Sequence, residues 1–311
     1  MDELNQLMKT LNVNNSQENW IYRGVSDSDF KLVPTLGRKL KDGTKFSSLC
    51  LAINHITEMI TQDYKQSKNI STNYTGLSQH YGLPTLALDW TYCDDVALYF
   101  AFTTYIIDFF KEKFENNKNL KMEVLREEFN QHEYAIYMLD QKFIDKKGSK
   151  YNLILKIAET DLYNDRMKNQ QGLLSELDYK NNSSIDVTKS QIEIMKEWAI
   201  KNDKKISIYE CDKSEPNNKI VTHVKTLQIN GQIFAKKIYF KLRQQDREKL
   251  MKRLSENDII TNKLFPDFEG IKRHLQISYA YNMLRDFKIA TDLYDSREDD
   301  FSNTEIIDFR K

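Results

Sequence analysis

The residues best suited to chemistry lie in two short clusters in the first third of the sequence. The first cluster contains Tyr22-Arg23-Gly24, and the second runs from Gln79-His80-Tyr81 to Asp89-Trp90-Thr91. Both combine hydrogen-bonding side chains and aromatic rings with short apolar runs, and each contains a glycine at which the backbone can bend. Loops carried by rigid elements are where binding groups usually sit, so the clusters predict a ligand-binding site at strand ends.

The elements that must position these clusters follow from the hydrophobic pattern. The pattern predicts an α+β fold, with a mixed or antiparallel sheet and flanking and C-terminal helices. The run from 96 to 110 is apolar nearly all round, which predicts a buried helix. Further helices are predicted at 46–66, at 190–201 and, with a break near Pro266, at 246–284. Strands are predicted at 20–25, 86–91, 134–139, 153–157, 206–209, 220–229 and 233–242.

The composition narrows the class of protein. The chain has 311 residues, of which 40% are hydrophobic, and this is enough for a folded core. Lys and Arg number 46, as do Asp and Glu, which excludes a wholly basic coat that binds DNA by charge alone. The sequence shows no membrane-spanning run, no secretory signal, no P-loop and no G-x-G-x-x-G turn. The spacing of Cys50, Cys93 and Cys211 predicts neither a disulfide framework nor a metal site, which favours the cytoplasm.

The two clusters resemble the FRG domain, a bacterial and phage family named for its Phe/Tyr-Arg-Gly start. The resemblance covers about residues 18–278, after an N-terminal extension at 1–17 and before a helix end and acidic tail at 279–311. Leu86-Ala87 departs from the Arg-Leu that is usual in the family, and Leu174 departs from the usual Phe-Thr. The matching segments are 21–24, 32–35 with Arg38, 79–85, 88–91, 97–101, 170–173 with Arg166, and 264–270.

A weaker similarity is to the ADP-ribosyltransferases, and it implies that NAD is the substrate. In that superfamily a first-strand arginine or histidine holds NAD, the middle strand and the following helix surround the nicotinamide, and a third strand supplies a polar group. An arginine fork matches phosphate, aromatic rings stack on nicotinamide, and the glycosidic bond breaks through an oxocarbenium-like state. The resemblance implies contacts with NAD by Arg23, Gly24, His80, Tyr81, Asp89, Thr91 and Tyr99.

The polar group on the third strand has two main candidates. Gln171 matches the Gln-Gly element of the family, and Glu176 is the nearest carboxylate after it. The two residues are five positions apart, so on an uninterrupted strand they face opposite sides of the sheet. Gln171 is favoured by its position, Glu176 is the carboxylate alternative, and Glu159 is a lesser candidate. With Arg23 and His80, Gln171 and Glu176 make up the predicted catalytic set.

Each of these residues also has a structural interpretation, and both interpretations stay open. Arg23 can form an ion pair with a nearby aspartate, and Asp89 can be that partner. His80 can be an ordinary structural histidine, and Thr91 can cap the helix that follows it. Tyr99 and Trp90 have apolar neighbours that favour plain core packing.

A basic run follows in the last third of the chain. From 232 to 253 there are eight basic and two acidic residues, with Tyr239 and Phe240 among them. A solvated surface is one interpretation. The other is a track for the phosphates of single-stranded RNA or DNA, with aromatic rings that stack on unpaired bases. The residues predicted to contact the nucleic acid are Lys236, Lys237, Tyr239, Lys241 and Arg243.

The resemblance therefore implies transfer of ADP-ribose from NAD to a macromolecule with no metal required, and the basic run favours RNA as the acceptor. It also implies a toxin or anti-phage effector, restrained by an antitoxin or another regulatory protein. Two alternatives stay open, namely an NAD glycohydrolase and a nucleotide- or nucleic-acid-binding module without catalysis.

Overall fold

The computed structural model describes residues 3–12, 20–49, 59, 79, 83–116, 122–144, 154–159, 165–179, 181–214 and 220–284. His80, Tyr81, Cys50, most of the helix predicted at 46–66 and the acidic tail lie outside these residues. The chain forms two compact units. The first consists of Met1–Phe102 with Glu133–Lys241, and the second of Thr103–His132 with Leu242–Lys311.

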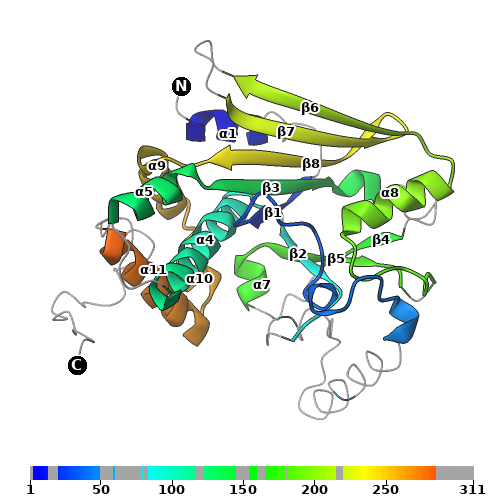
Figure 1. The fold of residues 1–311 in the computed structure, drawn as a ribbon, viewed down its shortest axis with the longest axis horizontal. Coiled ribbons are helices and arrows are strands. Elements are labelled where there is room, and N and C mark those ends of the chain that lie inside the picture. The colour runs from blue at the N-terminus through cyan, green and yellow to red at the C-terminus, as the bar shows by residue number, and fades with distance from the viewer. Residues whose placement is uncertain are drawn as a thin grey trace. The chain divides into compact units, whose positions relative to one another are not determined.

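The first unit is built on one antiparallel sheet of eight strands, shown in Figure 1. The spatial order of the strands is β4-β5-β2-β1-β3-β8-β7-β6. This arrangement, together with the helices, confirms the predicted α+β fold. The strands are β1 (Trp20–Val25), β2 (Leu88–Thr91), β3 (Glu133–Asp140), β4 (Leu155–Glu159), β5 (Gly172–Leu177), β6 (Ile206–Ser214), β7 (Ile220–Ile229) and β8 (Gln232–Lys241).

The helices divide between the two units. The first unit holds α1 (Glu3–Asn12), two 3-10 turns η1 (Gly37–Lys39) and η2 (Phe46–Ser48), the start of α4 (Asp94–Asn116), α7 (Asp165–Asn169) and α8 (Gln191–Lys201). The second unit holds the rest of α4 with α5 (Met122–Gln131), α9 (Gln244–Glu256), α10 (Thr261–Leu264) and α11 (Phe268–Leu284). Within the part of the chain that is described, no helix is long and apolar enough to cross a membrane.

The register of the strands decides which residues share a face of the sheet, because directly paired residues point to the same side. Arg23 pairs with Tyr137, Tyr137 with Lys237, and Lys237 with Lys225. These residues define the Arg23 face. The neighbouring position on β1, Gly24, points the other way and defines the Gly24 face.

The Arg23 face carries the main hydrophobic core beneath α8. Ile21, Trp90 and Leu173 of the sheet belong to this core, with Ile194 and Met195 of α8. A buried polar chain crosses it: the Trp90 Nε1 group donates to the Ser175 hydroxyl at 2.7 Å, and that hydroxyl donates to Gln191 Oε1 at 2.6 Å. Because buried polar groups need partners, this chain fixes the start of α8 against β5.

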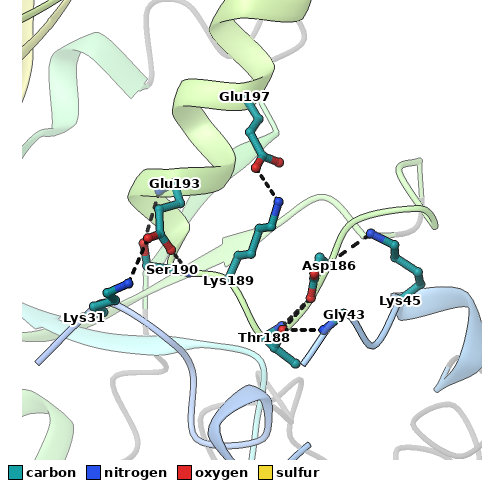
Figure 2. A network of polar contacts seen from close by, with 9 residues as sticks. All are labelled: Lys31, Gly43, Lys45, Asp186, Thr188, Lys189, Ser190, Glu193 and Glu197. Carbon is teal, nitrogen blue, oxygen red and sulfur yellow. Dashed lines mark hydrogen bonds and ion pairs between the residues drawn. The ribbon is translucent and has the colours of Figure 1, made fainter. Parts of the chain in front are cut away.

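The start of α8 is also tied to the loop that follows β1, as Figure 2 shows. The Ser190 side chain accepts a hydrogen bond from the Glu193 N–H, and the Glu193 carboxylate accepts one from the Ser190 N–H, which forms a capping box. Lys31 contacts the same carboxylate at 3.1 Å. Thr188 bonds both to Asp186 and to the Gly43 N–H. These contacts join the start of α8 to the loops at Lys31 and Gly43.

The Gly24 face is covered by the first turns of α4. A Cβ atom on Gly24 would lie 1.8 Å from the Ala97 carbonyl oxygen and 3.0 Å from the Ala101 nitrogen. Tyr99 and Phe102 of this helix are fully buried, as the apolar sequence predicts. Gly24 therefore allows the helix and the strand to approach closely.

The second unit contains a buried arginine. Arg247 on α9 is 3% exposed, and its guanidinium donates to Asn130 Oδ1 at 2.7 Å and to the Leu242 carbonyl at 2.9 Å. It also lies 4.7 Å from the centre of the Phe129 ring. Arg247 is therefore a packing residue and adds no charge to the surface of the basic run.

His274 on α11 predicts a loss of stability in acid. Burial lowers its pKa to about 4, against 6.5 in an unfolded chain, so the folded protein holds the ring neutral. Between these pH values the unfolded state binds more protons, and stability falls as pH drops from 6.5 towards 4. The loss is at most about 3 kcal/mol at 1.36 kcal/mol per pKa unit. Urea unfolding at several pH values checks this: His274→Gln is expected to flatten the dependence, and an unchanged slope would contradict it.

Candidate functional site

The two sequence clusters meet in one chain of polar contacts. Arg23 Nη1 on β1 donates to the Asp89 backbone carbonyl at 2.6 Å and lies 3.9 Å from Asp89 Oδ2. The Gln79 amide donates to Asp89 Oδ2 at 2.5 Å, and the Thr85 hydroxyl donates to Gln79 Oε1 at 2.9 Å. Segments that are 66 residues apart in the sequence are thus joined at the junction of β1 and β2.

The electrostatics of this junction favour an anionic ligand. The Arg23 side chain is 22% exposed, and removal from water lowers the pKa of its guanidinium, with Asp89 opposing that effect and the positive charge of Arg38 adding to it. Removal from water also raises the pKa of Asp89, although Arg23 and the Gln79 hydrogen bond oppose the rise. The positive charges of Arg23 and Arg38 oppose each other, and a nearby anion offsets this repulsion.

Arg23 also has a structural task. Among the described residues, β1 and β2 pair at one position, Tyr22 with Thr91. Beyond that pair, the Arg23 guanidinium bonds to the Asp89 carbonyl, which a neighbouring strand would otherwise satisfy. The ion-pair interpretation is therefore confirmed for Asp89, and it is compatible with a partly exposed guanidinium that contacts a ligand.

Three residues expected around the ligand have structural partners instead. Gly24 was expected to contact NAD, but it faces α4, and the backbone of that helix occupies the space beside it. The Thr91 hydroxyl donates to the Gln170 carbonyl at 2.7 Å and accepts from the Cys93 N–H at 3.0 Å, which closes a turn before α4 and does not cap the helix, because α4 begins at Asp94. The Tyr99 ring is fully buried in the core.

The two candidates for the third-strand polar group do not lie on one strand. Gln171 is exposed and precedes β5 with a positive φ of 46°, so the strand starts after it and the assumption of an uninterrupted strand is wrong at this residue. Glu176 lies within β5 on the Gly24 face. Thr91 pairs with Tyr22, which shares that face, and also with Gly172, and Glu176 is four positions after Gly172 on the same strand. Its Oε1 is buried without a hydrogen bond among the described residues. Glu159 ends β4, and its side chain lies outside the described residues.

The basic run does not form a single track. Lys237, Tyr239 and Lys241 share the Arg23 face, whereas Lys236 points to the Gly24 face and its ammonium lies 4.6 Å from the centre of the Trp20 ring. Phe240 is 3% exposed and stacks on Tyr134, so it is not available to a base. Arg243 is exposed and precedes α9 in the second unit.

Two side chains near Arg23 belong to the junction although the predicted contacts did not include them. Gln79 orients Asp89, and its place beside His80 in the second cluster was the signal that pointed to it. Tyr137 pairs with Arg23 across the strands, and nothing in the sequence marks it as special. In the described part of the chain, no group of three or more His, Cys, Asp or Glu side chains is arranged to hold a metal ion.

Comparison with known proteins relates one segment of the chain to a protein family. Residues 18–107 match the family model of the FRG domain. This segment contains β1, β2 and the start of α4, and therefore both sequence clusters. No curated protein and no solved structure matches the chain.

Proposed function

From the premise that this chain carries an FRG domain, we propose that it transfers ADP-ribose from NAD to a macromolecule at the junction of β1 and β2. The observation that carries the proposal is the chain of contacts from Arg23 through Asp89 to Gln79, which unites the two clusters of the FRG segment at a partly exposed guanidinium. We further propose that the protein acts as a toxin or anti-phage effector, restrained by an antitoxin.

The order of the strands supports this proposal. The similarity to ADP-ribosyltransferases requires an arginine-bearing strand, a threonine-bearing strand and a polar third strand close together. β1, β2 and β5 are neighbours in the order β5-β2-β1, although β5 is separated from β2 by 80 residues of sequence. Thr91 and Gly172 pair directly, which places the Gln171 turn beside the end of β2.

The proposed reaction assigns separate tasks to the residues of the junction. Arg23 and Arg38 bind the phosphates of NAD, and the Asp89 carboxylate, oriented by Gln79, accepts a hydrogen bond from a ribose hydroxyl. The C–N bond between ribose and nicotinamide breaks, and nicotinamide leaves with the bonding electron pair. An acceptor oxygen or nitrogen then bonds to the ribose carbon and releases its proton. Gln171 or Glu176 polarises the acceptor or the 2′-hydroxyl, and His80 and Tyr81 complete the site.

A second function is favoured by the position of Glu176. This carboxylate lies on the Gly24 face, whereas Arg23 defines the opposite face. In this alternative the Asp89 carboxylate serves only as the ion-pair partner of Arg23, and Arg23 and Arg38 bind a nucleotide without breaking a bond. The alternative is therefore a nucleotide-binding module.

Incubation of the full chain with NAD labelled in its adenylate part, together with RNA, DNA and protein from cells, separates these functions. Label on a polymer is the result that the transferase proposal requires. Free ADP-ribose without labelled polymer indicates a glycohydrolase with water as the acceptor. NAD that binds but stays intact indicates the binding module and contradicts the transferase.

A further inference from the structure

A cavity of about 240 Å³ lies on the Arg23 face, between the start of α8 and strands β3, β8, β7 and β6. Four lysines whose side chains can reach it come from different parts of the chain: Lys31, Lys196, Lys225 and Lys237. Glu193 is a carboxylate in the same lining. Lys236 also borders the cavity, but its ammonium lies over the Trp20 ring on the Gly24 face. The cavity therefore carries an excess of positive charge.

Two of the four ammonium groups are held by surface ion pairs. Lys31 Nζ lies 3.1 Å from Glu193 Oε1, and Lys225 Nζ lies 2.6 Å from Glu210 Oε1. The side chains of both lysines are more than 40% exposed, and exposed pairs of this kind contribute little to stability. These ammonium groups can therefore move to an incoming anion at small cost.

The other two ammonium groups contact no carboxylate among the described residues. Lys196 is half-buried on α8 and has no hydrogen bond or ion pair in that part of the chain. Lys237 donates to the Ser28 carbonyl, and its Nζ lies 4.8 Å from the Tyr137 ring centre and 4.7 Å from that of Tyr239. Burial also lowers the pKa of Lys237, so its charge gains from an anion nearby.

Apolar and aromatic groups complete the cavity. Leu32, Leu227 and Ala235 are buried beneath it, and Ile208 is 46% exposed at its β6 side. The Tyr239 ring is half-buried in the lining. The cavity thus combines a basic rim with an apolar floor, which suits a ligand with a flat, weakly polar body and an anionic group at one end.

We propose that this cavity binds one nucleotide unit, with its phosphate on Lys196, Lys225 and Lys237 and its base on the apolar floor. The volume supports one unit, because pockets that enclose larger ligands measure roughly 300–1,000 Å³. The capping box of Ser190 and Glu193, drawn in Figure 2, holds the Glu193 side of the cavity in place before a ligand arrives. This site is separate from the Arg23–Asp89 junction and does not depend on the proposed transferase activity.

Titration calorimetry with the full chain tests the proposal, with AMP, adenosine and inorganic phosphate as probes. AMP is expected to bind at least about tenfold more tightly than adenosine, because the phosphate adds charge-assisted hydrogen bonds. Lys196→Ala is expected to weaken AMP binding by about tenfold, since one such contact is lost. Lys201→Ala is the matched control, because Lys201 is exposed at the end of the same helix and does not line the cavity.

The nucleotide unit can be a free nucleotide or one unit of a single-stranded nucleic acid, and a ten-residue oligoadenylate distinguishes the two. Competition between the oligomer and AMP for the Lys196-dependent site indicates a unit within a single strand, and binding of AMP alone indicates a free nucleotide. Crosslinking with 8-azido-AMP is expected to label peptides that contain Tyr137 or Tyr239. The proposal is overturned if neither probe binds, if AMP and adenosine bind equally, or if Lys196→Ala binds AMP as the wild type does.

Discussion

Replacement of Arg23 by lysine is expected to weaken NAD binding and ADP-ribose transfer about 10- to 100-fold while the protein stays folded. Lysine keeps the positive charge but loses the planar fork that fits a phosphate. A hydrogen bond to a charged group contributes about 1.5–3 kcal/mol, which sets this range. Calorimetry with NAD and incorporation of labelled ADP-ribose measure the two effects, and circular dichroism reports whether the fold is kept.

The control for Arg23→Lys separates ligand binding from the structural task of the same side chain. The melting temperature of Arg23→Lys, measured beside its affinity for NAD, provides this control, because the Nη1 bond to the Asp89 carbonyl joins β1 to β2. If Arg23 only closes the junction of β1 and β2, Arg23→Lys lowers the melting temperature and leaves NAD binding per folded molecule unchanged. That result would remove the Arg23 site from the proposal.

The elements that carry the site were predictable because their patterns are local. Trp20–Val25 and Leu88–Thr91 are short apolar runs next to turn residues, and Asp94-Asp95 marks a helix start before an apolar stretch. A helix that begins with two acidic residues and continues as an apolar run can be predicted without knowledge of the tertiary structure. The hydrophobic pattern did not predict the helix α1, and β5 entered only as the third strand that the resemblance implies, because both runs are short.

The cavity was not predictable, because it depends on register between distant strands. Lys237 and Lys225 come together through the pairing of β7 with β8, and Lys31 and Lys196 come from a loop and a helix. The basic run drew attention to neighbouring lysines instead. Strand alternation places Lys236 and Lys237 on opposite faces of the sheet. Residues that are adjacent in the sequence therefore do not form one basic surface here.

Local backbone conformation explains why Gln171 lies in a turn before β5 and not on the uninterrupted strand that we assumed. A left-handed φ of 46° at a residue other than glycine is uncommon, and nothing in the Gln-Gln-Gly sequence requires it. The Gln171 carbonyl accepts a hydrogen bond from the Tyr92 N–H at 3.1 Å, which ties the turn to the end of β2. The turn is therefore fixed by a contact with a segment far earlier in the chain.

The largest loss of stability is expected from Gly24→Ala. The new Cβ would lie 1.8 Å from the Ala97 carbonyl oxygen and 2.8 Å from the Ala97 carbonyl carbon, both of which belong to the backbone of α4. A helix backbone cannot yield as a flexible side chain does, so the strand and the helix must separate. Overpacking in a core costs about 1–3 kcal/mol and at times more, and we expect at least the upper end of this range.

Chemical unfolding compared with Gly43→Ala isolates the effect of that contact. Gly43 has a positive φ of 82°, but no atom of the described residues lies within 4 Å of the point that a Cβ would occupy, so alanine there adds backbone strain of about 1–2 kcal/mol without a clash. Gly24→Ala is expected to lose clearly more stability than Gly43→Ala. If Gly24→Ala unfolds like the wild type and loses only NAD binding, Gly24 serves the approach of a ligand, and the packing of α4 on β1 is not its reason.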